Sequence, residues 1–326
     1  MEKIQAALAK ARATRSGESS GENRVPPGQP PAGRPGPVPG PVPGPVPGPV
    51  PGPVPGPVPG MPGSTAALRA EAIAPDLPRS PDLLHDEEAI AAAWSALPGF
   101  AVQARRLERA HVVTFAGGAD AVSFDALRTR LLQQMRANGW RRVAITSPGA
   151  GCGKTTLSLN LAFSLARQPE VRTLLAELDL RRPSIARILG TPDRASLALA
   201  LAGEVPFDTC ALRLSQNLLL AANQGPARDA AELLASATTA QSLARIEAEY
   251  GPDITIFDMP PMLVTDDMMA FAGEVDCVLL VAAAEASTIK EVDTCERELA
   301  AQTSVLGVVL NKCRYTDRGA GYGYYD

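Results

Sequence analysis

A glycine-rich turn carries the strongest chemical signal in this sequence. The segment ITSPGAGCGKTT, residues 145–156, follows an apolar run and precedes a helical pattern. Glycines in such a turn let backbone N–H groups face a polyphosphate, a lysine can reach the β- and γ-phosphates, and the next hydroxyl can ligate Mg²⁺. The positive end of the following helix lies at the same place. The pattern therefore predicts an ATP or GTP site made by Gly149, Ala150, Gly151, Cys152, Gly153, Lys154, Thr155 and Thr156, although Pro148 stands where the strict pattern has glycine.

Acidic residues end two other apolar runs. Asp258 closes DITIFD, where an aspartate can hold Mg²⁺ through its water shell. Glu177 and Asp179 lie two residues apart in TLLAELDLRRPS and so share one face of an extended strand. One carboxylate could position the metal while the other accepts a proton from an attacking hydroxyl, and Arg181 and Arg182 could pair with phosphate or acidic groups. A turn cap at the first segment and a solvated strand exit at the second remain the alternatives.

The elements that would position these residues alternate between strand and helix. Val-, Ile- and Leu-rich runs without clear alternation predict strands that are covered on both faces. Helical patterns lie between them, so we expect a doubly wound, mainly parallel α/β domain with its ligand at the carboxyl ends of the strands. The expected strands are 142–147, 173–178, 217–222, 253–258, 276–283 and 305–310; the helices named as examples are 123–138, 154–167, 231–250 and 288–301.

Composition divides the chain into five parts. Six tandem GPVP units, residues 36–59, favour extended polyproline II, which could span roughly 75 Å at ~3.1 Å per residue. A spacer is the simple interpretation, and a proline-motif docking site is the alternative. The expected parts are a short amphipathic helix or frayed terminus at 1–15, a disordered linker at 16–80, a transitional segment with a short helix at 81–110, a P-loop domain at 111–312 and a flexible tyrosine-rich tail at 313–326.

The overall composition indicates which kinds of partner the protein binds and where in the cell it is found. A net charge of −4 gives no electrostatic case for nucleic acid. Five scattered cysteines show no metal-ligand spacing and predict reduced thiols in the cytoplasm. No stretch approaches the ~20 apolar residues of a membrane span, and the charged N-terminus lacks the apolar run of a signal peptide. We therefore expect a cytoplasmic protein that reaches a membrane only through a partner.

Taken in order, these motifs resemble those of the bacterial tyrosine kinases of exopolysaccharide and capsule assembly. The resemblance covers about residues 111–326 and rests on SPGAGCGKTT, ELDLRRP, DAAELLAS, FDMPP and the tyrosine-rich end. It implies that Lys154 and Thr155 bind ATP and Mg²⁺ and that Asp179 and Asp258 lie near the metal. The family's second acidic motif usually begins with the aspartate that helps activate the tyrosine hydroxyl, and here that residue is Glu177. Asn311 resembles the nucleotide-base contact of related ATPases.

The resemblance also gives the tail a function. Four of the five tyrosines, Tyr315, Tyr322, Tyr324 and Tyr325, fall in the last twelve residues. A glycine-rich tail of tyrosines suits an enzyme that phosphorylates the C-terminus of a second copy in trans, and each phosphate adds about −1.5 to −2 charges. A sticky exposed tail is the alternative.

The implied partners are a membrane adaptor of the polysaccharide co-polymerase (chain-length determinant) type, which would recruit the chain to the inner face of the membrane, and a phosphotyrosine phosphatase. The family's self-association motif aligns with Val122, Asp125 and Arg128, and only the last residue matches.

Two other functions remain open. A partitioning or septum-site ATPase of the same fold would carry a lysine five residues before the P-loop lysine, where this chain has Gly149. An ATP-binding scaffold without kinase activity would use the N-terminal helix and the GPVP spacer to recruit partners, and Glu177 is the feature that favours it.

Overall fold

Residues 87–313 are described by the structure, a computed structural model, and within them seven strands form one sheet. The strand order is β3-β4-β2-β5-β1-β6-β7, and every neighbouring pair is parallel except β3 with β4. The helix expected at 1–15, the GPVP units and the four tail tyrosines lie outside the described residues. The strands are β1 (Arg142–Thr146), β2 (Thr173–Glu177), β3 (Ala211–Ser215), β4 (Leu218–Ala221), β5 (Ile254–Asp258), β6 (Cys277–Ala283) and β7 (Ser304–Asn311).

Burial on both faces explains the composition of the central strands. Every residue of β2, β4, β5 and β6 is buried, which matches their continuous apolar runs. All six expected strands are confirmed, within one or two residues at their ends. The sequence did not predict β3, an edge strand whose outer half, from Arg213 to Ser215, is only partly buried.

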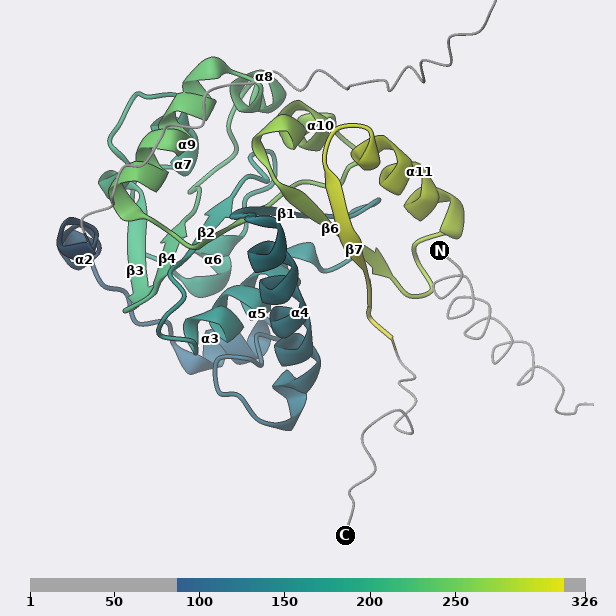
Figure 1. The fold of residues 1–326 in the computed structure, drawn as a ribbon, viewed down its shortest axis with the longest axis horizontal. Coiled ribbons are helices and arrows are strands. Elements are labelled where there is room, and N and C mark those ends of the chain that lie inside the picture. Colours follow the sequence, from purple (N-terminus) through teal and green to yellow (C-terminus); the bar gives the residue numbers. More distant parts are fainter. Residues whose placement is uncertain (1–86, 314–326) are drawn as a thin grey trace, which may run out of the picture. The chain divides into compact units, whose positions relative to one another are not determined.

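Helices cover both faces of the sheet, so the fold is the expected doubly wound one (Figure 1). One core cluster joins the sheet to α3, α4, α5 and α6, and the other joins it to α2 and α7 through α11. Within the described part of the chain, no helix combines the length and the apolar character needed to cross a membrane. The helices are α2 (Glu87–Ala96), α3 (Ala104–Arg109), α4 (Val122–Asn138), α5 (Lys154–Ala166), α6 (Ile185–Leu189), α7 (Leu197–Leu201), α8 (Ala230–Leu234), α9 (Ala237–Tyr250), α10 (Asp267–Phe271) and α11 (Ile289–Ala300), with short 3₁₀ turns η1 (Ala119–Ala121), η2 (Phe207–Thr209) and η3 (Ala272–Glu274).

The prediction of a single helix over 231–250 is wrong, because this segment forms two helices, α8 and α9. Ser236 stands between them in an extended conformation, and its side chain accepts a hydrogen bond from the Thr239 N–H at 3.1 Å. Serine is a preferred N-cap because its oxygen satisfies a backbone donor that the first helical turn leaves free. The local cap therefore starts a new helix inside a continuous apolar pattern.

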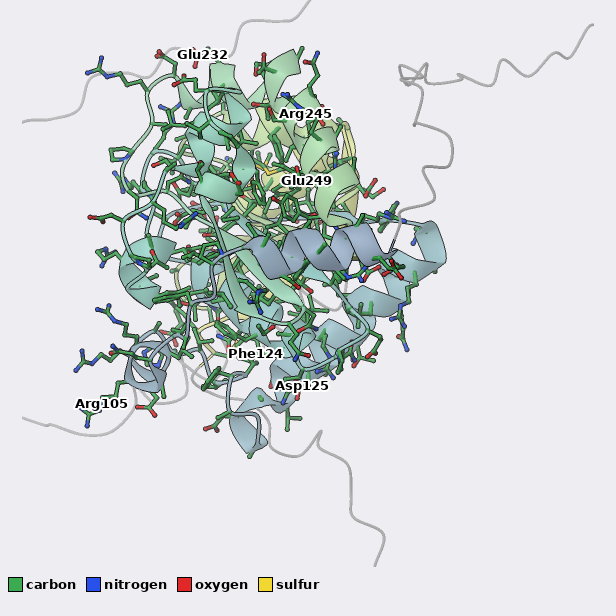
Figure 2. All side chains as sticks on the ribbon, turned by 90° about the vertical axis from the view of Figure 1, so that its left-hand side faces the viewer. Arg105, Phe124, Asp125, Glu232, Arg245 and Glu249 are labelled. Atoms are coloured by element: carbon green, nitrogen blue, oxygen red, sulfur yellow. The ribbon has the colours of Figure 1, made fainter. Side chains whose placement is uncertain are left out.

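The segment before the P-loop region packs onto the same folded unit. Ile90 and Trp94 of α2 are buried against α9, and Trp94 Nε1 donates to the carbonyl of Tyr250 at 2.6 Å. In Figure 2, α2 lies beside α9, whose Arg245 and Glu249 are labelled and exposed. The short helix expected within 81–110 is confirmed as α2, and this segment, expected to be transitional, adds apolar side chains to the core.

Strand register brings the three chemical motifs to one edge of the sheet. Asp258, the last residue of β5, pairs in register with Ile145 of β1 on one side and with Glu177 of β2 on the other. The glycine-rich turn follows β1, and ELDLRRP runs out of β2. Because these strands are parallel, their carboxyl ends meet at the same edge, where ligands bind in such folds.

Candidate functional site

The glycine-rich turn wraps onto the start of α5 with two glycines in left-handed conformations. Gly151 has φ +77° and Gly153 has φ +92°, values that side chains disfavour. A Cβ on Gly153 would lie 2.3 Å from Nδ2 of Asn311, which donates to the Cys152 carbonyl at 2.9 Å. Asn311, at the end of β7, thus contacts the loop backbone, and its predicted contact with the nucleotide base stays a prediction.

Hydrogen bonds within the loop and to a neighbouring segment hold its backbone in place. Ser147 Oγ donates to the Gly149 carbonyl at 2.7 Å, and the Met262 N–H donates to the Ser147 carbonyl at 2.8 Å. Thr146 Oγ1 also donates to the Pro260 carbonyl, at 2.7 Å. These contacts join the loop to the segment that leaves β5, so protein groups themselves fix the shape of its backbone.

Lys154 reaches the second acidic motif directly. Its Nζ lies 2.9 Å from Oδ2 of Asp179, and both side chains are about nine-tenths buried. The other oxygen of Asp179, Oδ1, accepts a hydrogen bond from the Arg182 backbone N–H at 3.1 Å. The structure thus brings together two of the predicted site residues, and it places the Asp179 carboxylate where the Lys154 side chain ends.

Asp258 lies under the first turn of α5. Its Oδ2 accepts from Thr155 Oγ1 at 2.7 Å and its Oδ1 accepts from Ser158 Oγ at 3.0 Å, with the side chain fully buried. Burial raises the pKa of Asp258, while the Lys154 charge and the two hydroxyls act to lower it. Ser158 was not among the predicted residues, although it lies one helical turn after Thr155 and on the same face of α5.

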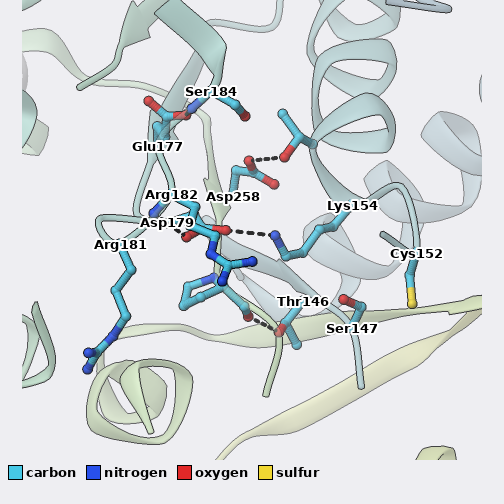
Figure 3. A network of polar contacts seen from close by, with 12 residues as sticks. Thr146, Ser147, Cys152, Lys154, Glu177, Asp179, Arg181, Arg182, Ser184 and Asp258 are labelled. Atoms are coloured by element: carbon cyan, nitrogen blue, oxygen red, sulfur yellow. Dashed lines mark hydrogen bonds and ion pairs between the residues drawn. The ribbon is translucent and has the colours of Figure 1, made fainter. Parts of the chain in front are cut away.

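A hydroxyl and a carboxylate in contact suit a magnesium ion that is bound together with a nucleotide. Mg²⁺ is usually held by one or two protein oxygens, several waters and the substrate phosphates. Thr155 and Asp258 can provide that pair of oxygens, and Asp179 lies at the end of the Lys154 side chain (Figure 3). Residues 87–313 contain no group of three His, Cys, Asp or Glu side chains that would hold a metal alone. Thr155 and Asp258 therefore fit a Mg²⁺ ion that is bound together with phosphate.

Glu177 shares the edge of the sheet but turns to other partners. Its Oε1 accepts from the backbone N–H groups of Ser184 and Ile185, and its Oε2 accepts from that of Asn223 at 2.9 Å. Asn223 Nδ2 returns a hydrogen bond to the Glu177 carbonyl at 2.8 Å. Burial raises the pKa of Glu177 to about 7, against these backbone hydrogen bonds, which act to lower it. The carboxylate braces the start of α6 and the end of β4, which favours a positioning role.

Comparisons with known proteins agree with this geometry. The putative tyrosine-protein kinase EpsB of Ralstonia nicotianae is 30% identical over 203 residues, which cover 62% of this chain and 27% of EpsB. The putative tyrosine-protein kinase CapB of Staphylococcus aureus is 28% identical over 204 residues, covering 62% of this chain and 88% of CapB. The kinase domain of the Escherichia coli tyrosine kinase ETK matches with a TM-score of 0.56 at 26% identity, over 64% of this chain and 82% of that domain.

These relatives confirm the predicted resemblance to bacterial tyrosine kinases, and the aligned part of this chain spans about a quarter of the length of EpsB. A family model matches the chain as well. Residues 143–321, more than half of the chain, match the family described as the CobQ/CobB/MinD/ParA nucleotide binding domain. This chain therefore belongs to the CobQ/CobB/MinD/ParA nucleotide-binding family.

Proposed function

We propose that this chain is an ATP-dependent protein-tyrosine autokinase that regulates the synthesis and export of an exopolysaccharide or capsular polysaccharide. The observation that carries the proposal is the 2.9 Å contact between Lys154 and Asp179. It joins the phosphate loop to an acidic motif that resembles one found in tyrosine kinases of polysaccharide assembly. The similarity to EpsB, CapB and the ETK kinase domain supports the same activity.

In the proposed reaction, a tyrosine oxygen attacks the γ-phosphorus of ATP. The bond from that phosphorus to the β,γ-bridging oxygen breaks, ADP leaves, and the phenolic proton passes to a carboxylate at the site. Lys154 would hold the β- and γ-phosphates, while Thr155, Asp179 and Asp258 would hold Mg²⁺. Bound Mg²⁺ would neutralise charge on the β- and γ-phosphate oxygens.

In the proposed reaction, Glu177 has a structural role, which rests on its hydrogen bonds to backbone N–H groups. Its two oxygens already accept three backbone hydrogen bonds, so it would keep the ELDLRRP loop in place. Its predicted part in activating the tyrosine hydroxyl stays a prediction. Asp179 lies beside the lysine that would hold the phosphates, which fits its proposed place near Mg²⁺.

The proposed protein substrate is the tail of a second copy, with Tyr315, Tyr322, Tyr324 and Tyr325 as acceptors. A membrane adaptor of the polysaccharide co-polymerase type would recruit the chain to the inner face of the membrane and activate it, and a phosphotyrosine phosphatase would reset it. The alternative of a partitioning or septum-site ATPase is disfavoured by Gly149, which stands where those proteins carry lysine.

The decisive test is to incubate the purified chain with Mg-ATP and map phosphotyrosine by mass spectrometry, with Lys154→Ala beside it. Phosphate on Tyr322, Tyr324 or Tyr325 that vanishes in the variant is the expected result. Transfer in trans is tested by mixing the Lys154→Ala chain with an active chain whose four tail tyrosines are phenylalanine. Phosphate should then appear on the Lys154→Ala chain.

A bare tail would lead to a second round with candidate adaptor fragments added. If the tail stayed bare while ATP still bound, the kinase proposal would fall. An ATPase or an ATP-binding scaffold would then be the better description.

A further inference from the structure

Two consecutive arginines leave the ELDLRRP loop in different directions. Arg181 is held by Asp267 in a two-pronged ion pair, with Nε 2.8 Å from Oδ2 and Nη2 2.9 Å from Oδ1. The Asp267 side chain is fully buried, so this ion pair ties the loop to the start of α10. Removing Arg181 would leave a buried carboxylate without that partner, which is costly. This ion pair accounts for the role of Arg181.

Arg182 has no such role. Its side chain is exposed, and within residues 87–313 it forms no ion pair with a carboxylate. Only its backbone is tied down, by the N–H that donates to Asp179 Oδ1 at 3.1 Å. Figure 3 shows its side chain extending to the Lys154 side of the loop, while Arg181 extends away from it. The loop thus presents, on the side of Lys154, a guanidinium that has no carboxylate partner among the residues the structure describes.

The charged side chains of the site favour a second cation beside Lys154. Asp179 and Asp258 carry two carboxylates against the single ammonium of Lys154. The turn has Gly149 and no second lysine, so the loop itself supplies no further cation. Negative charge on the γ-phosphate oxygens must be stabilised during transfer, and an arginine fits phosphate oxygens because its N–H groups form a planar fork.

We infer that Arg182 is a catalytic residue that binds the γ-phosphate of the nucleotide held by its own chain. This inference rests on the proposed function. Lys154 contacts the phosphates from the P-loop side, and Arg182 contacts the γ-phosphate from the ELDLRRP side. Because its backbone N–H is bonded to Asp179, the same hydrogen bond that fixes the acidic motif also sets where the Arg182 side chain begins. The γ-phosphate is absent from ADP, so Arg182 should discriminate between ATP and ADP.

The test compares Arg182→Gln, Arg182→Lys and the control Arg187→Gln, which removes another exposed arginine five residues further on. Fluorescent ADP and a non-hydrolysable fluorescent ATP analogue report binding, and mass spectrometry reports the rate of tail phosphorylation. Arg182→Gln should weaken binding of the ATP analogue about 10-fold with little change for ADP, and slow phosphorylation about 10³-fold, the lower end for an arginine that stabilises this transfer. Arg182→Lys should recover part of both, and Arg187→Gln should match the wild type.

The binding arm separates this inference from the proposed function. If the wild type never phosphorylates tyrosine but Arg182→Gln loses the preference for the ATP analogue, the kinase proposal fails and the γ-phosphate contact stands. If phosphorylation occurs and Arg182→Gln neither slows it nor changes the preference, the function stands and the Arg182 inference is overturned. A wild type without any preference for the ATP analogue over ADP also overturns it. Unchanged thermal unfolding of Arg182→Gln shows that the loop remains folded.

Discussion

Asp258 and Glu177 end neighbouring parallel strands and pair in register, yet they have different partners. Both side chains are fully buried. Asp258 accepts hydrogen bonds from the hydroxyls of Thr155 and Ser158 on α5. Glu177, which is longer by one methylene, accepts hydrogen bonds from backbone N–H groups at the start of α6 and the end of β4.

The two kinds of hydrogen-bond donor differ in how freely they can rearrange when a ligand binds. A hydroxyl can rotate and give its oxygen to a metal, so the Asp258 cluster can rearrange when a ligand binds. A backbone N–H at a helix start or a strand end cannot turn away without local unfolding, and leaving it unpaired is costly. Two buried carboxylates at equivalent positions can therefore have different roles. Asp258 can take part in metal binding, and Glu177 stabilises the start of α6 and the end of β4.

The largest expected effect that would test this division is on activity. Asp258→Asn keeps the size of the side chain but removes the charge that would hold Mg²⁺, so tail phosphorylation should fall about 100-fold or more. Thermal unfolding should change little, because the amide oxygen still accepts a hydroxyl and a buried charge is removed. Initial rates of phosphotyrosine formation and a melting curve measure the two effects. Near-normal activity would place the metal elsewhere.

Next in size is the stability effect of Glu177→Ala. The substitution leaves two buried backbone donors and one partly buried donor without their acceptor, at about 1–3 kcal/mol for each buried one, so the free energy of unfolding should fall by about 3 kcal/mol or more. The melting temperature should then drop by roughly 6–12 °C, as measured by circular dichroism. Glu204→Ala, at an exposed position, is the matched control and should melt like the wild type. An unchanged melting temperature for Glu177→Ala would contradict the bracing role.

Asn223→Ala should have a smaller effect on the same brace. It removes the 2.8 Å bond from Nδ2 to the Glu177 carbonyl and the 3.0 Å bond that Oδ1 accepts from the Ala198 N–H. The backbone N–H of residue 223 still reaches Glu177, so we expect a loss of about 1–2 kcal/mol in denaturant unfolding. Its effect combined with Glu177→Ala should be less than the sum of the two, since they share partners. Strict additivity would show that the two side chains act separately.

The last prediction concerns the pH dependence of stability. Burial raises the pKa of Glu177 from its usual 4.5 to about 7, so the folded state binds more protons than the unfolded state between these values. The stabilising contribution is fully present below about pH 4.5 and is lost as the pH rises through about 7. The free energy of unfolding of Glu177→Gln should change less over this interval than that of the wild type. Parallel curves for the two proteins would assign the pH dependence to another group.

Much of the fold followed from local patterns. Apolar runs predicted β1, β2, β4, β5 and β6 because strands covered on both faces need apolar side chains throughout, and a similar run predicted the edge strand β7, which is only partly buried. The edge strand β3 was missed, since its antiparallel pairing and partial exposure leave a short and mixed pattern. The break between α8 and α9 was missed because the cap of Ser236 lies inside an apolar repeat.

The sequence by itself determined that a glycine-rich turn would lead into a helix at Lys154, because glycines allow the positive φ that Gly151 and Gly153 adopt there. It also determined that acidic residues would end β2 and β5 at the same edge of the sheet. Only the tertiary structure decided what each acid contacts, because the donors near Glu177 come from segments up to 46 residues away. The fold places the Thr155 hydroxyl within reach of the shorter Asp258 side chain. It also places free backbone N–H groups within reach of the longer Glu177 side chain, which therefore stabilises the segments that carry them.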